Sequence, residues 1–235
     1  MPFVFPAPPQ ASLSIAGNGL RYPVRRIFCV GRNYAAHSVE MGGDPTREEP
    51  FFFTKPAHAV WQGDGDIPFP PQTNELHHEM ELVVALGKPG SNITVENALD
   101  HVWGYGAGID LTRRDLQATA KQQRRPWDLS KGFDHSAPIS AVMAASQIGH
   151  PQSGQVSLSV NGDVRQKGDL DQQIWKVAEV IANLSTYVEL QPGDLIMTGT
   201  PAGVAELHPG DRVEGIIDGI GKIEFTLGAK PEASS

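Results

Sequence analysis

Cysteine is almost absent from this chain: Cys29 is the single one among 235 residues. An intramolecular disulfide needs two cysteines, so a disulfide framework is excluded, and the composition fits a reducing compartment such as the cytoplasm. Cys29 lies in the apolar run of residues 26–30. We expect it to be a small core residue rather than a nucleophile, because free cysteines are among the most buried residue types.

An excess of positive charge and long apolar segments are also missing. The chain has 19 Lys and Arg residues against 27 Asp and Glu residues, a formal net charge of −8 at pH 7. This balance argues against nucleic acid or an anionic membrane surface as the main partner, but permits a small anionic substrate. No apolar run is long enough to span a membrane, and the proline-rich start lacks the cationic region of a signal peptide.

The apolar runs that are present predict a mainly β fold of the α+β class, with helices at its periphery. We expect residues 1–20 to form an irregular leader, residues 21–229 a single domain and residues 230–235 a frayed tail. The expected strands cover residues 24–30, 51–56, 80–86, 102–109, 195–198, 213–217 and 223–227. The expected helices cover residues 33–41, 94–100, 113–123 and 175–190. A hairpin is expected over residues 156–167, with Asn161-Gly162 as its tight turn.

Two carboxylates sit at the start of the most apolar strand. Glu79 and Glu81 are two residues apart, and residues i and i+2 of a strand point to the same face. Asp110 directly follows a glycine-rich strand, where another backbone or a ligand comes close. Buried like charges repel, and Mg²⁺, Mn²⁺ or Ca²⁺ would compensate them through all-oxygen ligation. One exposed glutamate and one glutamate in a salt bridge to an arginine would explain the pair equally well, and Asp110 alone also fits the cap of the next helix.

His37 and Glu40 are three residues apart on a predicted short helix and therefore share one face. A carboxylate beside an imidazole fixes its tautomer and raises its basicity, which suits a general base that activates water. An exposed histidine in a surface ion pair is the commoner arrangement and stays open. Lys131 lies in a predicted loop, residues 127–136, where it suits an oxyanion clamp.

Basic residues and one turn complete the candidates for binding an anionic substrate. The turn at residues 199–203 offers backbone N–H groups and the Thr200 hydroxyl to a carboxylate, or is only a turn. The basic candidates are Arg32, Lys55, Arg114, Arg124 and Arg125. Taken singly, each is more commonly a solvated charge than a ligand.

Several segments together resemble the fumarylacetoacetate hydrolase family. In the family's order they are residues 29–37 (CVGRNYAAH), 53–56 (FTKP), 77–81 (HHEME), 110–117 (DLTRRDLQ), 129–133 (LSKGF) and 195–204 (LIMTGTPAGV). As a set they are most similar to the short, single-domain branch that includes acylpyruvases and fumarylpyruvate hydrolases.

The resemblance implies a mixed β-sandwich roll, usually a homodimer, with residues 21–229 as the catalytic domain. It implies Mg²⁺ or Mn²⁺, with Ca²⁺ as a substitute, on Glu79, Glu81 and Asp110. The catalytic residues it implies are His37 and Glu40, which activate water, and Lys131, which stabilises the oxyanion. The residues it places on the substrate are Arg32, Tyr34, Lys55, Arg114, Gln117 and Thr200.

The expected function is therefore metal-dependent hydrolysis of a C–C bond in a small anionic 2,4-dioxo acid, an acylpyruvate. The favoured reaction converts fumarylpyruvate and water to fumarate and pyruvate. Decarboxylation of oxaloacetate is the first alternative, because it needs the same metal but no hydrolytic water; isomerisation or decarboxylation of a dienedioate is the next. A silent metal- or ligand-binding module is the non-enzymatic alternative, against which the joint presence of His37, Glu40 and Lys131 argues.

Overall fold

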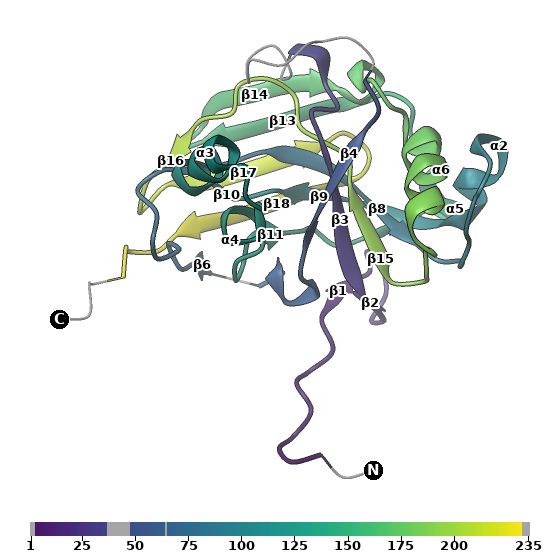
Figure 1. The fold of residues 1–235 in the computed structure, drawn as a ribbon, viewed down its shortest axis with the longest axis horizontal. Coiled ribbons are helices and arrows are strands. Elements are labelled where there is room, and N and C mark those ends of the chain that lie inside the picture. Colours follow the sequence, from purple (N-terminus) through teal and green to yellow (C-terminus); the bar gives the residue numbers. More distant parts are fainter. Residues whose placement is uncertain (1–2, 37–47, 64, 232–235) are drawn as a thin grey trace.

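Two β-sheets packed face to face form the body of the protein (Figure 1), in a computed structural model that describes residues 3–36, 48–63 and 65–231. The larger sheet has the order β12 (Met143–Ala144), β9 (Val102–Ile109), β8 (Met80–Leu86), β15 (Asp194–Met197), β3 (Arg26–Gly31) and β4 (Phe51–Lys55). The smaller has the order β14 (Asp163–Asp169), β13 (Gln155–Val160), β17 (Arg212–Ile217), β18 (Gly221–Leu227) and β6 (Asp66–Ile67). Both sheets are mixed, because β15 runs parallel to β3 and β18 parallel to β6.

Short elements complete the structure. The short strands are β1 (Ser12–Ser14) with β2 (Arg21–Pro23), β5 (Val60–Trp61) with β11 (Ala137–Pro138), and β10 (Thr112–Arg113), β7 (Leu76–His77) and β16 (Glu206–Leu207) in a third group. The helices are η1 (Ala57–Ala59), α2 (Val95–Ala98), η2 (Leu99–His101), α3 (Arg114–Gln123), α4 (Asp128–Lys131), α5 (Ala145–Ile148), η3 (Leu170–Gln172) and α6 (Val177–Tyr187). The predicted mainly β class is confirmed. None of the described helices is long and apolar enough to cross a membrane.

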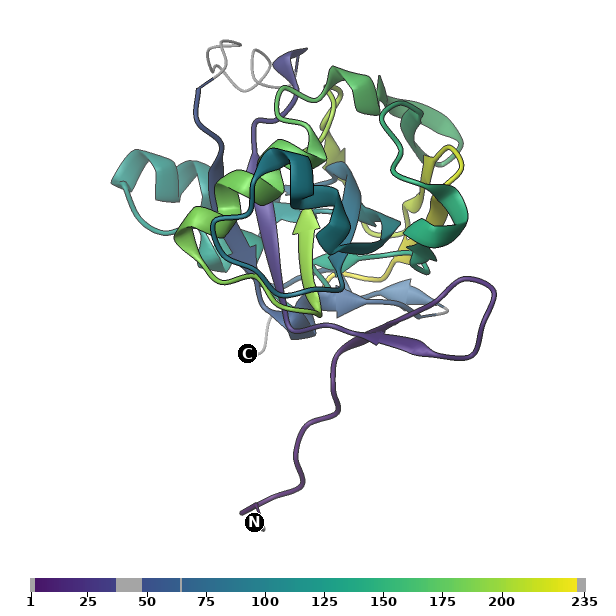
Figure 2. The same cartoon turned by 90° about the vertical axis from the view of Figure 1, so that its right-hand side faces the viewer.

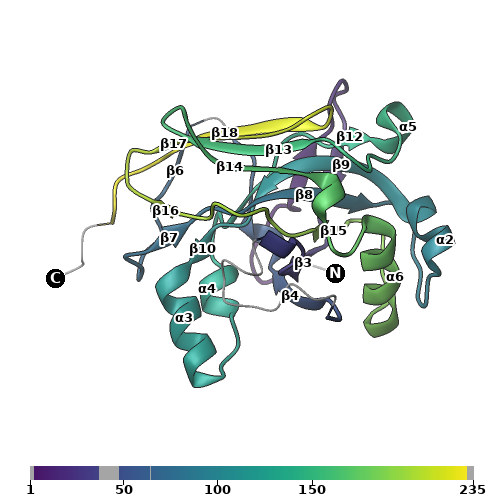
Figure 3. The ribbon, with the colours of Figure 1, turned by 90° about the horizontal axis from the view of Figure 1, so that it is seen from above.

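Strand β8 is buried on both faces, which explains its continuous apolar run. On one face, Leu82 and Val84 join the core between the two sheets. On the other face, Val83 and Ala85 pack with a second cluster that includes Cys29. Seen from above, the smaller sheet lies over the larger one, with α3 and α4 at one side and α6 at the other (Figure 3). Cys29 is thus a core residue, as expected, and burial raises the pKa of its thiol.

The predictions that depend on the sequence of a single strand, turn or helix are confirmed. Strand β9 begins and ends as predicted, and Asn161-Gly162 is the two-residue turn between β13 and β14. The helix predicted over residues 175–190 is α6, and it buries Val177, Val180, Ile181 and Leu184, whose spacing predicts one apolar face that also includes Val188, the residue at its C-cap. In β9, an added Cβ at Gly104 would lie 2.2 Å from Met143 O. The glycine-rich strand is therefore explained at that position by the close approach of another backbone.

Two local predictions are wrong. The expected irregular leader contains β1, which pairs with β2 in an antiparallel ladder from residue 12. The expected loop around Lys131 contains α4, a single helical turn that ends at that lysine. Both elements are too short to show a periodic pattern, and tertiary contacts decide them. Before β1, the chain extends away from the body of the protein (Figure 2). Where this segment meets the body, Gln10 Nε2 donates a hydrogen bond to Val24 O at 2.7 Å.

Candidate metal centre and active site

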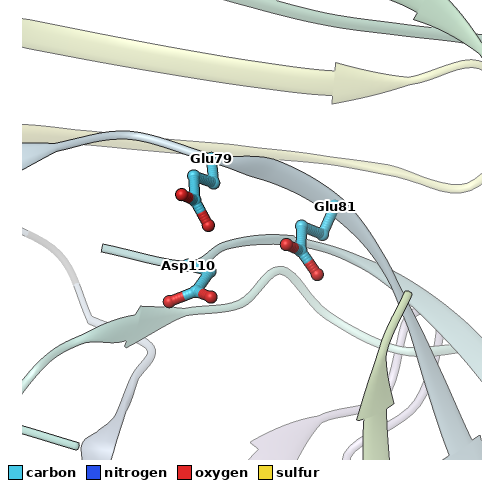
Figure 4. A group of neighbouring side chains, drawn as sticks. All are labelled: Glu79, Glu81 and Asp110. Atoms are coloured by element: carbon cyan, nitrogen blue, oxygen red, sulfur yellow. The ribbon is translucent and has the colours of Figure 1, made fainter. Parts of the chain in front are cut away.

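Three acidic side chains meet at one end of the β8–β9 ladder, where they point toward one another (Figure 4). Glu81 pairs with Gly108 in this antiparallel register, and the Asp110 N–H donates to Glu79 O at 2.8 Å. Asp110 is therefore the cross-strand neighbour of Glu79, which alternation places on the same side as Glu81. Carboxylate oxygens of the three buried residues lie within 4.8 Å of one another. The structure thus brings together the three carboxylates that were predicted as ligands.

Three basic side chains neutralise two of these carboxylates. Lys131 Nζ lies 2.7 Å from both Glu79 Oε2 and Asp110 Oδ2. Lys55 Nζ lies 2.8 Å from Asp110 Oδ1, and Arg114 Nη2 lies 2.5 Å from Glu79 Oε1. Burial acts to lower the pKa of Lys131, but the carboxylates of Asp110 and Glu79 outweigh it and raise the pKa. The salt bridge considered for the glutamates therefore exists at Glu79, although neither glutamate is exposed.

Glu81 differs from the other two acids, because it forms no ion pair within the part of the chain that the structure describes. Its Oε2 accepts a hydrogen bond from the Gly199 N–H at 2.8 Å. Gly199 has a φ of +94°, and an added Cβ would lie 2.7 Å from Asn33 Cβ, so this close approach requires glycine. Burial, followed by the charges of Asp110 and Glu79, raises the pKa of Glu81 well above its usual range.

The donor set fits a hard divalent cation. All three candidate ligands offer carboxylate oxygens, which Mg²⁺ and Mn²⁺ prefer to nitrogen and sulfur. Of three oxygens around one octahedral Mg²⁺, at least two pairs are neighbours, about 3 Å apart. Oxygens within 4.8 Å of one another therefore need to close by up to about 2 Å. Glu81 has no ion-pair partner among the described residues, so an ion bound beside it would compensate its charge.

Glu79 and Glu81 line a cavity, whereas Asp110 is not among its lining residues. Among the described residues, the charged lining consists of Arg32, Glu79, Glu81, Arg114, Lys121 and Lys131. Its remaining lining includes Phe51, Phe53 and Trp127, which are aromatic, and Gln117 and Thr200, which are polar. The cavity thus joins the acidic centre to a cationic and aromatic wall, an arrangement suited to a small anionic ligand with an apolar segment.

Helix α3 supplies one side of this wall. Arg114, Gln117 and Lys121 stand at positions i, i+3 and i+7, which share one helix face. Arg114 is held in place, because its Nη1 donates to Gln117 Oε1 at 2.6 Å and its Nε lies 3.3 Å from His77 Nδ1. The face therefore carries a fixed guanidinium next to Glu79 and a lysine two turns further along.

Two residues predicted to contact substrate are not part of the cavity lining. Lys55 Nζ is buried and donates to the backbone carbonyls of Leu111, at 3.1 Å, and Lys131. Through its ion pair, Lys55 instead compensates the charge of Asp110. Tyr34 is also buried and is hydrogen-bonded to the Gln173 side chain. His37 and Glu40, the predicted water-activating pair, lie outside the described residues.

Two cavity-related residues escaped the sequence analysis. Lys121 belongs to a polar helix in which its spacing from Arg114 was the available signal. Gln166 lies on β14, far from the motifs, and is fully buried. Its Oε1 accepts from Met80 N–H at 3.0 Å, and its Nε2 donates to Thr200 Oγ1 at 2.8 Å. No local pattern marks such a residue, because both partners come from other strands and turns.

A buried carboxylate triad beside a cationic cavity, on a mixed β-sandwich roll, defines the class of metal-dependent enzymes that act on small organic anions. The model of the fumarylacetoacetate (FAA) hydrolase C-terminal family matches residues 26–228. The chain therefore belongs to the fumarylacetoacetate hydrolase family, as the motifs predicted.

Three relatives illustrate how close the chain lies to characterised members. The crystal structure of fumarylpyruvate hydrolase from Pseudomonas aeruginosa, in complex with Mn²⁺ and pyruvate, has a TM-score of 0.95 and is 48% identical, covering 97% of this chain and 100% of that one. A fumarylpyruvate hydrolase of Ralstonia sp is 42% identical over 79% of this chain and 96% of its own. An oxaloacetate tautomerase of Escherichia coli is 40% identical over 85% and 91%.

Proposed function

We propose that this protein is a metal-dependent hydrolase that cleaves acylpyruvates at a C–C bond, with fumarylpyruvate and water giving fumarate and pyruvate. The observation that carries the proposal is the carboxylate triad of Glu79, Glu81 and Asp110 at the end of a cavity walled by basic residues. The Mn²⁺ and pyruvate in the similar Pseudomonas aeruginosa structure match the cofactor and the product that such a site would hold.

Glu79, Glu81 and Asp110 would hold Mg²⁺ or Mn²⁺, which, when bound, supplies Lewis-acid stabilisation of negative charge on a 2-oxo acid. Arg114 pairs with Glu79 and contacts Gln117. These two side chains can therefore orient the carboxylate of the substrate's 2-oxo acid group. The Thr200 hydroxyl accepts from Gln166, which leaves its own O–H free to donate toward the cavity.

Hydrolysis also requires a base for water and a cation for the oxyanion. We assign the base to His37, the last residue of the family-like motif at residues 29–37, and its orientation to Glu40, three residues further along the chain. We assign the stabilisation of the oxyanion to Lys131, which lines the cavity and whose raised pKa keeps its amine protonated at neutral pH. The C–C bond between the attacked carbonyl and the pyruvate half then breaks. Its electron pair stays with the pyruvate half, where the negative charge is stabilised.

A second reaction has an observation in its favour. The oxaloacetate tautomerase relative is 40% identical, close to the 42% of the Ralstonia hydrolase, so sequence similarity alone separates the two activities weakly. Tautomerisation or decarboxylation of oxaloacetate uses the same acidic centre but no hydrolytic water. The described cavity does not exclude oxaloacetate, because this dianion carries the same 2-oxo acid group as an acylpyruvate.

A substrate panel tests the proposal directly. With Mn²⁺ or Mg²⁺ present, we expect fumarylpyruvate to be cleaved with the highest kcat/KM, followed by acetylpyruvate, with release of stoichiometric pyruvate. Loss of dioxo-acid absorbance and coupled detection of pyruvate measure the two events independently. Turnover of oxaloacetate with no pyruvate from any acylpyruvate would contradict the hydrolase assignment and favour the second reaction.

The catalytic pair separates hydrolysis from decarboxylation. We expect His37→Ala and Glu40→Gln each to lower kcat/KM for acylpyruvate cleavage by about 10²- to 10⁴-fold, the usual effect of removing a general base. Any oxaloacetate decarboxylation should fall much less, because CO₂ leaves without a nucleophile. Hydrolysis that persists in His37→Ala would mean that another group activates the water.

We also propose that the protein works as a homodimer in the cytoplasm. The dimer follows from the family, and the location from the single cysteine, which leaves the fold independent of an oxidising compartment. Sedimentation velocity at micromolar concentration should give one species of twice the chain mass of 25.3 kDa. A single monomeric species would contradict the dimer.

A further inference from the structure

Among the described residues, four basic ones line the cavity, and two of these four have no acidic partner in the part of the chain that the structure describes. Arg114 and Lys131 are paired with Glu79, at 2.5 and 2.7 Å. Arg32 and Lys121 line the same cavity, and neither forms an ion pair with any of the described residues. The positive charge in excess therefore lies on the side of the cavity formed by these two residues.

Lys121 is held in this position although the position is electrostatically costly. Its Nζ lies 5.7 Å from the centre of the ring of Trp127, which lines the same cavity, and forms a cation–π contact with it. Partial burial, followed by the positive charges of Arg32 and Arg114, lowers the pKa of Lys121. An anion placed between Arg32 and Lys121 would relieve this repulsion.

The distance between Lys121 and Arg114 along α3 indicates how long the ligand is. Seven residues separate it from Arg114, about 10 Å along a helix axis. In an extended seven-carbon chain such as fumarylpyruvate, the two carboxylate carbons are roughly 7–8 Å apart, from ordinary carbon–carbon bond lengths. In oxaloacetate they are only about 4 Å apart. The side chains of Arg114 and Lys121 shorten the distance that a ligand has to bridge. Fumarylpyruvate can then contact both residues at once, whereas oxaloacetate is too short.

We propose that Arg32 and Lys121 form a second carboxylate subsite, which binds the distal carboxylate of a dicarboxylic acyl group and selects it over neutral acyl groups. The proposal rests on the hydrolase function proposed above, which places the 2-oxo acid end at the carboxylate triad. Phe51 and Trp127 then line the cavity beside the unsaturated middle of the substrate.

The decisive measurement is a ratio of specificities. In wild-type protein and in Lys121→Met, kcat/KM is determined for fumarylpyruvate and for acetylpyruvate, whose acyl group carries no charge. We expect the ratio of the two values to fall by about 10- to 100-fold in Lys121→Met, the effect of losing a hydrogen bond to a charged group. Arg32→Gln should change the ratio in the same direction. Lys167→Met, which removes an exposed lysine from β14, should leave it unchanged.

A binding measurement keeps this test separate from catalysis. With Mn²⁺ present, fumarate should bind Lys121→Met about tenfold or more weakly than the wild type by calorimetry, while pyruvate should bind both equally. An unchanged specificity ratio, or equal fumarate affinity, would overturn the subsite even if the wild type cleaves acylpyruvates. If the wild type cleaves no acylpyruvate, the hydrolase proposal fails, and fumarate affinity alone decides the subsite. Thermal unfolding of Lys121→Met checks that the variant is folded.

Discussion

Glu81 and Asp110 are both buried acids of the same centre, but their surroundings differ. Asp110 contacts two lysines, Lys55 and Lys131, at 2.8 and 2.7 Å, whereas Glu81 receives one backbone hydrogen bond from Gly199. A buried charge without a counter-ion destabilises the fold, so its removal costs no stability. Removal of a paired charge destabilises the fold, because its partner is left as an uncompensated buried charge. The two acids therefore make different contributions to stability and the same contribution to metal binding.

Neutral substitutions of these acids should separate the two contributions. We expect Asp110→Asn to lower the free energy of unfolding of the metal-free protein by about 3 kcal/mol or more, because buried Lys55 loses its anion and buried Lys131 keeps only Glu79. Glu81→Gln should leave that free energy unchanged or raise it. Both variants should lose high-affinity Mn²⁺ binding by calorimetry. Equal destabilisation by the two substitutions in denaturant titrations with EDTA would contradict this account.

Gln166 is the residue whose hydrogen bonds tie the acidic strand to the turn that carries Thr200. Its carboxamide contacts Met80 N, Thr200 Oγ1 and Pro201 O at 2.8–3.0 Å, with no exposed surface. Gln166→Met fills a similar volume but leaves these groups without a partner. We expect the free energy of unfolding to fall by about 2–3 kcal/mol. Lys167→Met, on the next and exposed residue, is the control and should match the wild type within about 0.5 kcal/mol.

At the scale of elements, α3 depends on a carboxylate at its first turn. Asp115 accepts hydrogen bonds from Thr73 Oγ1 at 2.6 Å, Asn74 N–H at 2.9 Å and Leu116 N–H at 2.8 Å. Burial acts to raise the pKa of Asp115, but these hydrogen bonds outweigh it and lower the pKa below its ordinary value of 3.8. The carboxylate therefore fastens the start of the helix to the segment before β7 and so positions the cavity wall.

Asp115→Asn should weaken this attachment in a pH-dependent way. A lowered folded-state pKa contributes stability that is complete above the unfolded-state pKa and is lost as pH falls through the folded-state pKa. We expect Asp115→Asn to lower the free energy of unfolding by about 1 kcal/mol, equally at pH 7 and pH 5, with the difference shrinking only below about pH 4. Denaturant titrations at several pH values measure this. A difference that already declines between pH 7 and 5 would point to another group.

At the scale of the whole molecule, the fold and the metal centre are supported separately. The cores between and behind the sheets are apolar, and Lys55, Lys131 and Arg114 already balance two of the three carboxylates. The metal-free protein should therefore remain folded. Removal of the metal therefore tests its role in catalysis without unfolding the protein.

Excess EDTA should abolish hydrolysis but leave the far-ultraviolet circular dichroism spectrum unchanged. Addition of Mn²⁺ at about 100 times its dissociation constant should restore activity and raise the free energy of unfolding by about 2.7 kcal/mol, because the ion binds only the folded state. Mg²⁺ should act in the same way. Full activity in excess chelator would contradict the metal assignment, and loss of the spectrum would contradict the separate support of the fold.

The sequence by itself determined the features that depend on neighbouring residues. The limits of β9, the Asn161-Gly162 turn, the buried stripe of α6 and the i, i+2 spacing of Glu79 and Glu81 all follow from local periodicity or turn geometry. The motifs also predicted the family, because their order along the chain is specific. These features required no knowledge of which strands pair.

Only the tertiary structure decided how distant residues meet. The β8–β9 register places Asp110 opposite Glu79, and a slip of one residue would turn it to the other face. The contacts of Lys55 and Lys131 with Asp110, and of Gln166 with Thr200, join segments 21 to 55 residues apart. Lys121 is a cavity residue only because α3 lies beside the acidic centre. Such placements come from sheet pairing and side-chain packing across the core, which no local pattern encodes.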